Sequence, residues 1–124
     1  MTDDRDARAV ALFWELAADL IAAHPDVVEG TIMRGPCLRV RDEFLALVDY
    51  KRSGLVVKLP EARVRELIAS GVGREFAPAG KVFRQWLSVP ERSKRVWRAL
   101  LREGISTAAS SPPKRKRKFP RAQR

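Results

Sequence analysis

The sequence of 124 residues has little of the chemistry that most catalytic and metal sites use: one cysteine, one histidine and one tyrosine. The single cysteine, Cys37, cannot form an intrachain disulfide, which disfavours a small secreted scaffold. His24 stands beside Pro25 at the expected end of a helix, where capping is favoured over catalysis. No group of cysteines and histidines has the spacing of a zinc site. The sequence therefore predicts neither an enzyme nor a bound metal or cofactor.

Long hydrophobic runs are also missing. No apolar segment approaches the ~20 residues that span a bilayer, and aspartates, not basic residues, precede the first apolar ones, unlike a secretory signal peptide. The chain is 45% hydrophobic and 32% charged, enough apolar content for one folded domain. Before residue 114, arginine outnumbers lysine 14 to 4, which indicates a GC-rich bacterial source. We expect a single-domain cytoplasmic protein, nucleoid-associated if bacterial, without a membrane partner.

Charge is distributed very unevenly along the chain, whose net charge is +10. Residues 1–49 hold 5 basic and 10 acidic residues, whereas residues 50–104 hold 13 basic and 5 acidic residues. Residues 105–124 hold 7 basic residues and no acidic residue. This polarity predicts a polyanionic partner that faces the C-terminal half.

Hydrophobic periodicity predicts an α+β fold. We expect a sheet of about four to five antiparallel strands with helices on one face, in the order helix, three hairpin-linked strands, helix, strand, helix. The expected helices are 3–23, a segment from Pro60 to Gly71, and one from Pro90 to Gly104. The expected extended segments are 30–33, 37–41, 44–50, 55–59 and 81–89, with a tight turn at Asp42-Glu43 and a loop at 71–80. Residues 1–104 would form the domain, and residues 105–124 a disordered basic tail.

Several of these segments resemble one protein family. They are the run Val28-Glu29-Gly30-Thr31-Ile32-Met33-Arg34-Gly35-Pro36-Cys37-Leu38-Arg39-Val40, the strands at 44–48 and 55–59, and Trp86 with Val89-Pro90. Over about residues 10–103 the chain resembles the MmcQ/YjbR family, and more loosely the N-terminal domain of TfoX/Sxy proteins. The resemblance implies a CyaY-like fold of the frataxin and secretion-chaperone group and a presumed DNA-binding role without enzymatic activity. The family commonly has Gly-Lys where this chain has Asp42-Glu43, so a basic hairpin tip is not expected.

The third expected helix carries an arginine stripe opposite an apolar stripe of Val96, Trp97, Leu100 and Leu101. Guanidinium groups bind phosphate bidentately, so the stripe suits phosphate contacts. A solvated helix face is the alternative. The candidate residues on the folded part are Lys81, Arg84, Arg92, Arg95, Arg98 and Arg102.

Two further features concern nucleic acid. Trp86 shares a predicted strand face with Arg84, which makes it the best candidate for base stacking, whereas Trp97 is expected in the core. Flexible basic arms bind nucleic acid without sequence preference. If all 7 cations of residues 105–124 met phosphates, the salt slope of binding would approach about −6. The candidate residues in the tail are Lys114, Arg115, Lys116, Arg117, Lys118 and Arg121.

Other roles of the tail stay open: a nuclear-localisation signal in a eukaryote, contact with anionic membrane, or simple solubilisation. The leading hypothesis is a non-enzymatic protein that binds nucleic acid, DNA rather than RNA, mainly through the phosphate backbone. The alternative is a protein-interaction or homodimerising module of secretion-chaperone-like fold, in which the basic tail is incidental.

Overall fold

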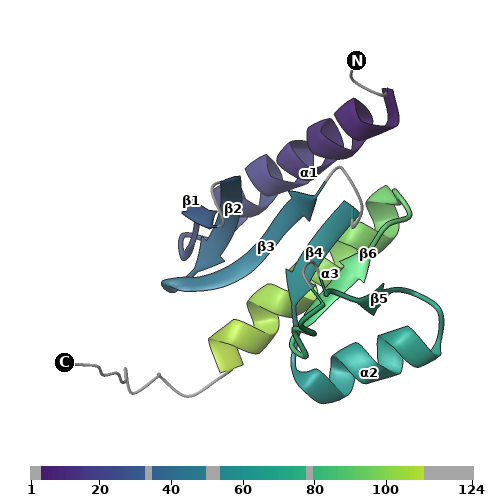
Figure 1. Ribbon diagram of the computed structural model, residues 1–124. Helices are drawn as coiled ribbons and strands as arrows, with labels where there is room; N and C mark the ends of the chain where they lie inside the picture. The colour runs from purple at the N-terminus through teal and green to yellow at the C-terminus, as the bar shows by residue number, and fades with distance from the viewer. Residues whose placement is uncertain (1–3, 33–34, 50–53, 78–79, 111–124) are drawn as a thin grey trace.

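The computed structural model describes residues 4–32, 35–49, 54–77 and 80–110. Six strands form one antiparallel sheet in the order β1-β2-β3-β4-β6-β5, with three helices (Figure 1). The elements are α1 (Asp4–Ala23), β1 (Val27–Ile32), β2 (Gly35–Val40), β3 (Glu43–Asp49), β4 (Gly54–Lys58), α2 (Glu61–Ala69), β5 (Arg74–Glu75), β6 (Trp86–Val89) and α3 (Lys94–Ser110). The α+β class and the antiparallel sheet are confirmed. The predicted strand count and order are wrong, because four strands link α1 to α2 and the expected loop contains β5.

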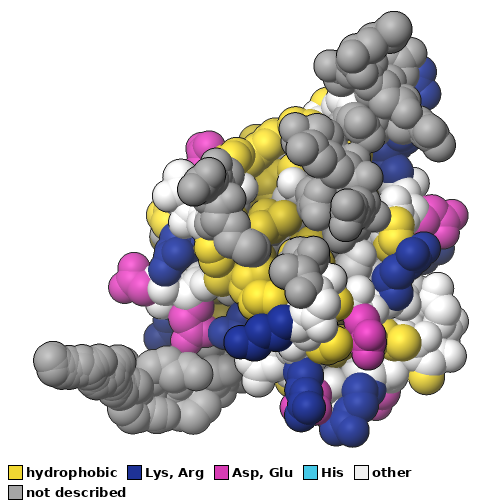
Figure 2. Space-filling view, in the orientation of Figure 1, with side chains coloured by type: hydrophobic (Ala, Val, Ile, Leu, Met, Phe, Trp, Pro, Cys, Tyr) yellow, Lys and Arg dark blue, Asp and Glu magenta, His cyan; other side chains and the backbone are white. Residues whose placement is uncertain are grey.

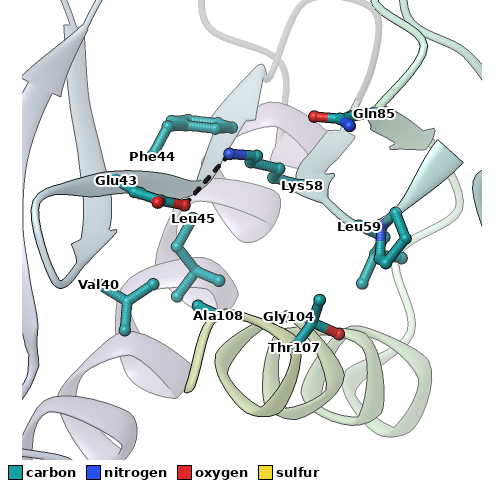
Figure 3. A pocket seen from close by; sticks show the side chains of 11 residues that line it. Val40, Glu43, Phe44, Leu45, Lys58, Leu59, Gln85, Gly104, Thr107 and Ala108 are labelled. Carbon is teal, nitrogen blue, oxygen red and sulfur yellow. Dashed lines mark hydrogen bonds and ion pairs between the residues drawn. The ribbon is translucent and has the colours of Figure 1, made fainter. Parts of the chain in front are cut away.

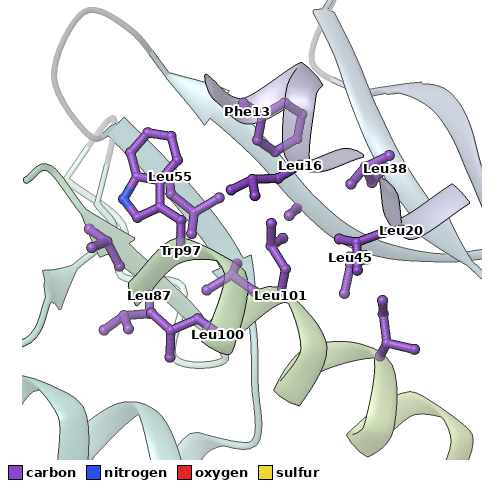
Figure 4. Close-up of a cluster of buried hydrophobic side chains, with 14 of the residues drawn as sticks. Phe13, Leu16, Leu20, Leu38, Leu45, Leu55, Leu87, Trp97, Leu100 and Leu101 are labelled. Atoms are coloured by element: carbon purple, nitrogen blue, oxygen red, sulfur yellow. The ribbon is translucent and has the colours of Figure 1, made fainter. Parts of the chain in front are cut away.

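The main core lies between the sheet and the helices, all three of which contribute buried side chains to it. Phe13 and Leu16 from α1 and Trp97 from α3 meet leucines of the strands (Figure 4). A bulge shapes this layer: Leu38 pairs with Ala46 and Arg39 with Phe44, so Leu45 is an extra residue in β3. Leu45 and Ala46 both join the main core as a result.

The opposite face of the sheet carries a second, smaller apolar cluster. Its buried members are Cys37, Phe44, Leu47, Val56 and Phe76, and the half-buried Ile32, Phe83 and Trp86 pack against them. In Figure 1 the strands are drawn in front of α1 and α3, and Figure 2 shows hydrophobic side chains gathered at the centre of that view. The sheet therefore has apolar side chains on both faces.

The hairpin between β2 and β3 turns one residue earlier than the sequence predicts. Val40 pairs with Glu43, so the two turn residues are Arg41 and Asp42, with φ of 52° and 69°. Positive φ at both central residues matches the type I′ turn, whose twist suits a two-residue hairpin. Arg39 Nη2 donates a hydrogen bond of 2.7 Å to the Asp42 carbonyl oxygen. Glu43 belongs to β3.

The predicted strand at 81–89 is wrong over its first half. Only Trp86–Val89 pairs as β6, and a turn at Arg84-Gln85 precedes it. The backbone N–H of Phe83 donates to the Phe76 carbonyl, and that of Trp86 donates to the Phe83 carbonyl. These bonds occupy backbone groups of residues 83 and 86 that a continuous strand would have used to pair with a neighbouring strand.

Helix α3 begins later and ends later than the sequence predicts. Ser93 precedes it, and the Ser93 Oγ accepts a hydrogen bond of 3.3 Å from the Val96 backbone N–H, as an N-cap does. Gly104 does not end the helix. A Cβ there would lie 2.8 Å from Leu45 Cδ1 and 3.3 Å from the Lys58 carbonyl oxygen, so this glycine allows close packing. Ile105 is buried beyond it. The expected tail boundary at 104 therefore falls inside α3.

Candidate nucleic-acid interface

Helix α3 is strongly two-sided. Trp97 and Leu101 are fully buried, and Leu100 and Ile105 are nearly so. Trp97 Nε1 donates a hydrogen bond of 2.9 Å to the Glu91 carbonyl oxygen, which joins the helix to the segment before it. The packing and this bond fix the rotation of α3, and they leave one side of it facing solvent.

That solvent side carries four cations, called here the α3 basic stripe: Lys94, Arg95, Arg98 and Arg102. Together with Ala99 they line one shallow depression on the surface. Arg95 and Arg102 are exposed, and Arg98 is half-buried. Three of the predicted arginines, Arg95, Arg98 and Arg102, are thus brought together on one helix face.

The three arginines of the stripe have no acidic partner within ion-pair distance in the part of the chain that the structure describes. The arginines of α2 differ. Arg63 Nε lies 2.6 Å from Glu103 Oε2 and its Nη1 lies 3.1 Å from Glu66 Oε1. The hydrogen bonds that Arg63 donates to these carboxylates, first to Glu103 and then to Glu66, raise the pKa of Arg63. Glu103, the neighbour of Arg102 in sequence, is therefore engaged away from the stripe.

Lys94 is the member of the stripe that does have a partner. Its Nζ lies 2.7 Å from Glu15 Oε2 of α1. This hydrogen bond and the charge of Lys94 lower the pKa of Glu15, and the charge of Arg98 adds to the effect. Glu15 therefore supplies negative charge at the N-terminal end of the stripe.

Lys94 is also the stripe residue that the sequence reasoning missed. The predicted set begins at Arg92, but the helix begins at Lys94, so exposed Arg92 precedes it. Positions 94, 98 and 102 are four residues apart, which is the spacing of neighbours on a helix surface. Counting back four residues from Arg98 would have identified Lys94.

Lys81 and Arg84 lie outside the α3 basic stripe. Both are exposed and precede β6. Arg84 lines a different depression, of 250 Å³, together with Glu61 and Arg65 of α2 and Glu75 of β5. The predicted patch is therefore divided between two surfaces. The tail candidates Lys114, Arg115, Lys116, Arg117, Lys118 and Arg121 lie outside the described residues.

Trp86 does not offer a free ring for base stacking. Its ring is stacked on Phe44 at a centroid distance of 4.2 Å and on Phe76 at 5.5 Å, and Phe83 lies 4.8 Å away. The ring belongs to the second apolar cluster. Trp97 is fully buried, which confirms its predicted place in the core.

A cavity of 170 Å³ lies where the C-terminal part of α3 meets the sheet (Figure 3). The two charged residues that line it, Glu43 and Lys58, pair with each other at 3.3 Å. Much of the remaining wall is apolar, including Leu45, Leu59 and Ala108. This pairing leaves the lining without net charge, so the cavity is a poor site for an anion.

Cys37 has the surroundings of a structural thiol. It is fully buried in the second apolar cluster. Burial, the largest effect, raises the pKa of the thiol, although the charge and hydrogen bond of Arg39 act in the opposite direction. A protonated, buried thiol is a poor nucleophile.

The described residues offer neither a metal centre nor a membrane-spanning helix. They contain no group of three histidine, cysteine, aspartate or glutamate residues placed to hold a metal ion. Their helices include none that is both long and apolar enough to cross a membrane. In comparisons with known proteins, no family model, no curated protein and no solved structure matches the chain significantly.

Proposed function

We propose that this chain binds nucleic acid, duplex DNA in preference to RNA, through phosphate contacts of the α3 basic stripe. The observation that carries the proposal is the placement of Arg95, Arg98 and Arg102 on one solvent-facing side of one helix, with no acidic side chain within ion-pair distance among the described residues. Unpaired guanidinium groups in a row are poised to bind phosphate oxygens bidentately.

The first turn of α3 supports an anionic partner. Lys94 and Arg95 occupy it, and it contains no acidic residue. The N-terminus of a helix carries partial positive charge, so cations are unfavourable there for the helix alone. The same charges and the helix dipole would add their attraction for a phosphate placed beside this turn. Glu15 already offsets part of this repulsion at Lys94, and an anionic ligand beside Arg95 would offset more of it.

Binding through this surface would be largely independent of base sequence. The side of α3 opposite the stripe is buried against the sheet, which limits how deeply the helix can enter a groove. Arginine contacts to phosphate fix position and carry no sequence information directly. The cations at 114–118 would add flexible, sequence-independent attraction.

We also propose that the chain is related to the MmcQ/YjbR family, which it resembles in sequence. That relationship would give it the CyaY-like fold and the presumed DNA-binding role of the family. A bacterial member with this function would act in the cytoplasm, at the nucleoid. It would work without a cofactor and without catalysis.

The test is fluorescence anisotropy of a labelled duplex of about 20 base pairs with full-length variants. Replacing Arg95, Arg98 and Arg102 by Gln should weaken binding at low salt by more than tenfold. The reason is that fewer counterions are released on binding when phosphate contacts are lost. Replacing the five cations at 114–118 by Ala should also weaken it by more than tenfold. Unchanged affinity in the first variant would show that the α3 arginines do not contribute to binding. Unchanged affinity in the second variant would show the same for the cations at 114–118.

A further inference from the structure

Strand β1 forms an open edge of the sheet, since β2 is its only neighbour in the strand order (Figure 1). It is six residues long, which is a full-length strand for a globular protein. It contains no proline and no lysine, residues with which proteins commonly protect such edges. Glu29 is its one charged residue, and an open edge of this length is a template for pairing with another strand.

The ladder between β1 and β2 shows which backbone groups point outward. The Arg41 N–H donates to the Asp26 carbonyl at 3.2 Å, and the pairing of Val28 with Arg39 and Gly30 with Cys37 continues the same register. Hydrogen-bonded and non-hydrogen-bonded pairs alternate in antiparallel strands. The N–H and C=O groups of Val28 and Gly30 thus point to β2, and those of Glu29 and Thr31 point away from the sheet.

The outward groups of Glu29 and Thr31 have no hydrogen-bond partner within the described ranges, whereas the Val27 N–H is bonded to the His24 carbonyl at 3.0 Å. Two donors and two acceptors are therefore available on this edge, two residues apart. That is the arrangement which an antiparallel strand satisfies.

The sequence of β1 is complementary to itself when the strand pairs antiparallel about Gly30. A two-fold axis at Gly30 would place Glu29 opposite Thr31 of the second copy, so that the outward groups of each satisfy those of the other. The carboxylate would then face a hydroxyl. An axis at Glu29 would instead place two carboxylates opposite each other, which is destabilising.

Apolar side chains agree with the same register. Val28 is 49% exposed, one of few large hydrophobic residues of the described chain that are this open. With the axis at Gly30, Val28 faces Ile32 of the second copy in a non-hydrogen-bonded pair, where side chains come closest. Ile32 already packs against the second apolar cluster. Pairing would bury Val28 and extend that cluster across the two copies.

We propose that the partner of the β1 edge is a second copy of this chain, paired antiparallel about Gly30 into a continuous twelve-stranded sheet. Residues that face each other across this axis lie on the same face of the sheet, so the axis is perpendicular to it. Both copies would keep their helices on one side. The proposal is independent of nucleic-acid binding.

Sedimentation equilibrium of the full chain, after nuclease treatment and in high salt, tests it. The expected result is a mass that rises with concentration toward twice that of the monomer. A monomer mass at every concentration up to about 1 mM would overturn the proposal.

Three variants at one position test the register. Thr31→Pro should abolish the dimer, because it removes an outward N–H that β2 does not use, and proline is tolerated at such edge positions. Thr31→Glu places a second carboxylate opposite each Glu29, and Thr31→Lys places an ammonium there. Two such pairs per dimer should separate the two dissociation constants by about tenfold or more, with the lysine variant tighter. Circular dichroism checks that each variant is folded. If Thr31→Pro does not fold, the Glu and Lys variants decide alone, and equal dissociation constants would refute the register.

Discussion

Glu15 lies where α1 meets the basic side of α3, and its carboxylate holds Lys94 at 2.7 Å. Among the described residues it is the carboxylate that pairs with the stripe, and it competes with any phosphate for Lys94. Glu15→Gln should therefore tighten binding to a duplex severalfold at low salt, because it frees one cation and removes one repulsive charge. Anisotropy titration measures the change.

Asp19→Asn is the matched control for this prediction. Asp19 is exposed on the same helix, and no ion pair joins it to α3 among the described residues. The control removes the same charge without releasing Lys94. Equal gains in affinity from both variants would show that net charge matters and that the Glu15–Lys94 contact does not.

The lowered pKa of Glu15 also predicts the sign of a pH effect. A carboxyl whose pKa is lower in the folded state contributes stability above its ordinary value of 4.5, and this contribution is lost as pH falls through the folded-state pKa. At neutral pH the midpoint of thermal unfolding should thus be higher for the wild type than for Glu15→Gln. That difference should shrink as pH falls below 4.5. A difference that grows toward acid pH would contradict the assigned contact.

Gly104 lies inside α3, where it allows the helix to pack closely against the sheet. Alanine is favoured over glycine inside a helix by about 1 kcal/mol. At this position, however, the added Cβ would lie 2.8 Å from Leu45 Cδ1 and 3.3 Å from a carbonyl oxygen of β4. Gly104→Ala should therefore lower the free energy of unfolding, by about 1–3 kcal/mol. Chemical denaturation gives the value.

Ser106→Ala serves as the control because Ser106 is exposed on the same helix. It raises helix propensity without a packing conflict, so stability should stay equal or increase slightly. A Gly104→Ala protein as stable as this control would mean that α3 does not pack against β3 and β4 as closely as the structure has it.

The same glycine shows how far the sequence could predict the elements. The first two helices and the strands at 37–41, 44–50 and 55–59 were predictable, because their hydrophobic periodicity and their turn residues agree. Gly104 looked like a helix end, since glycine commonly follows one. Its actual role depends on Leu45 and the Lys58 carbonyl, which are distant in sequence. The segment 81–85 alternates like a strand, but its backbone bonds to Phe76 and to a local turn override that pattern.

The candidate site was predictable to a similar depth. The sequence placed Arg95, Arg98 and Arg102 on one helix face. It could not distinguish them from Arg63 and Arg65, which also lie on a predicted helix outside its apolar face. The difference is tertiary, because Glu103 and Glu66 pair with Arg63, and Glu61 lies 3.7 Å from Arg65. Which cations remain available for a ligand depends on the fold.

For the whole molecule, the two proposals can be combined. In a dimer paired through β1, both helical layers lie on the same side of the continuous sheet, so the two α3 basic stripes would lie on that side as well. A duplex long enough to reach both would bind more tightly by avidity. Thr31→Pro should then weaken binding to a long duplex more than binding to a duplex that reaches only one stripe. Anisotropy with the two lengths compares them, and equal loss on both would show that the copies bind separately.

We attribute the binding of nucleic acid by the folded surface to the location of the α3 arginines and not to the total charge. The most direct test compares two full-length variants with the same net charge over a salt series. One replaces Arg95, Arg98 and Arg102 by Gln. The other replaces Arg8, Arg65 and Arg74 by Gln; these arginines are exposed on α1, α2 and β5. We expect the first variant to lose affinity and its salt slope to fall by about 3, while the second keeps the wild-type slope. Equal changes in both variants would contradict it.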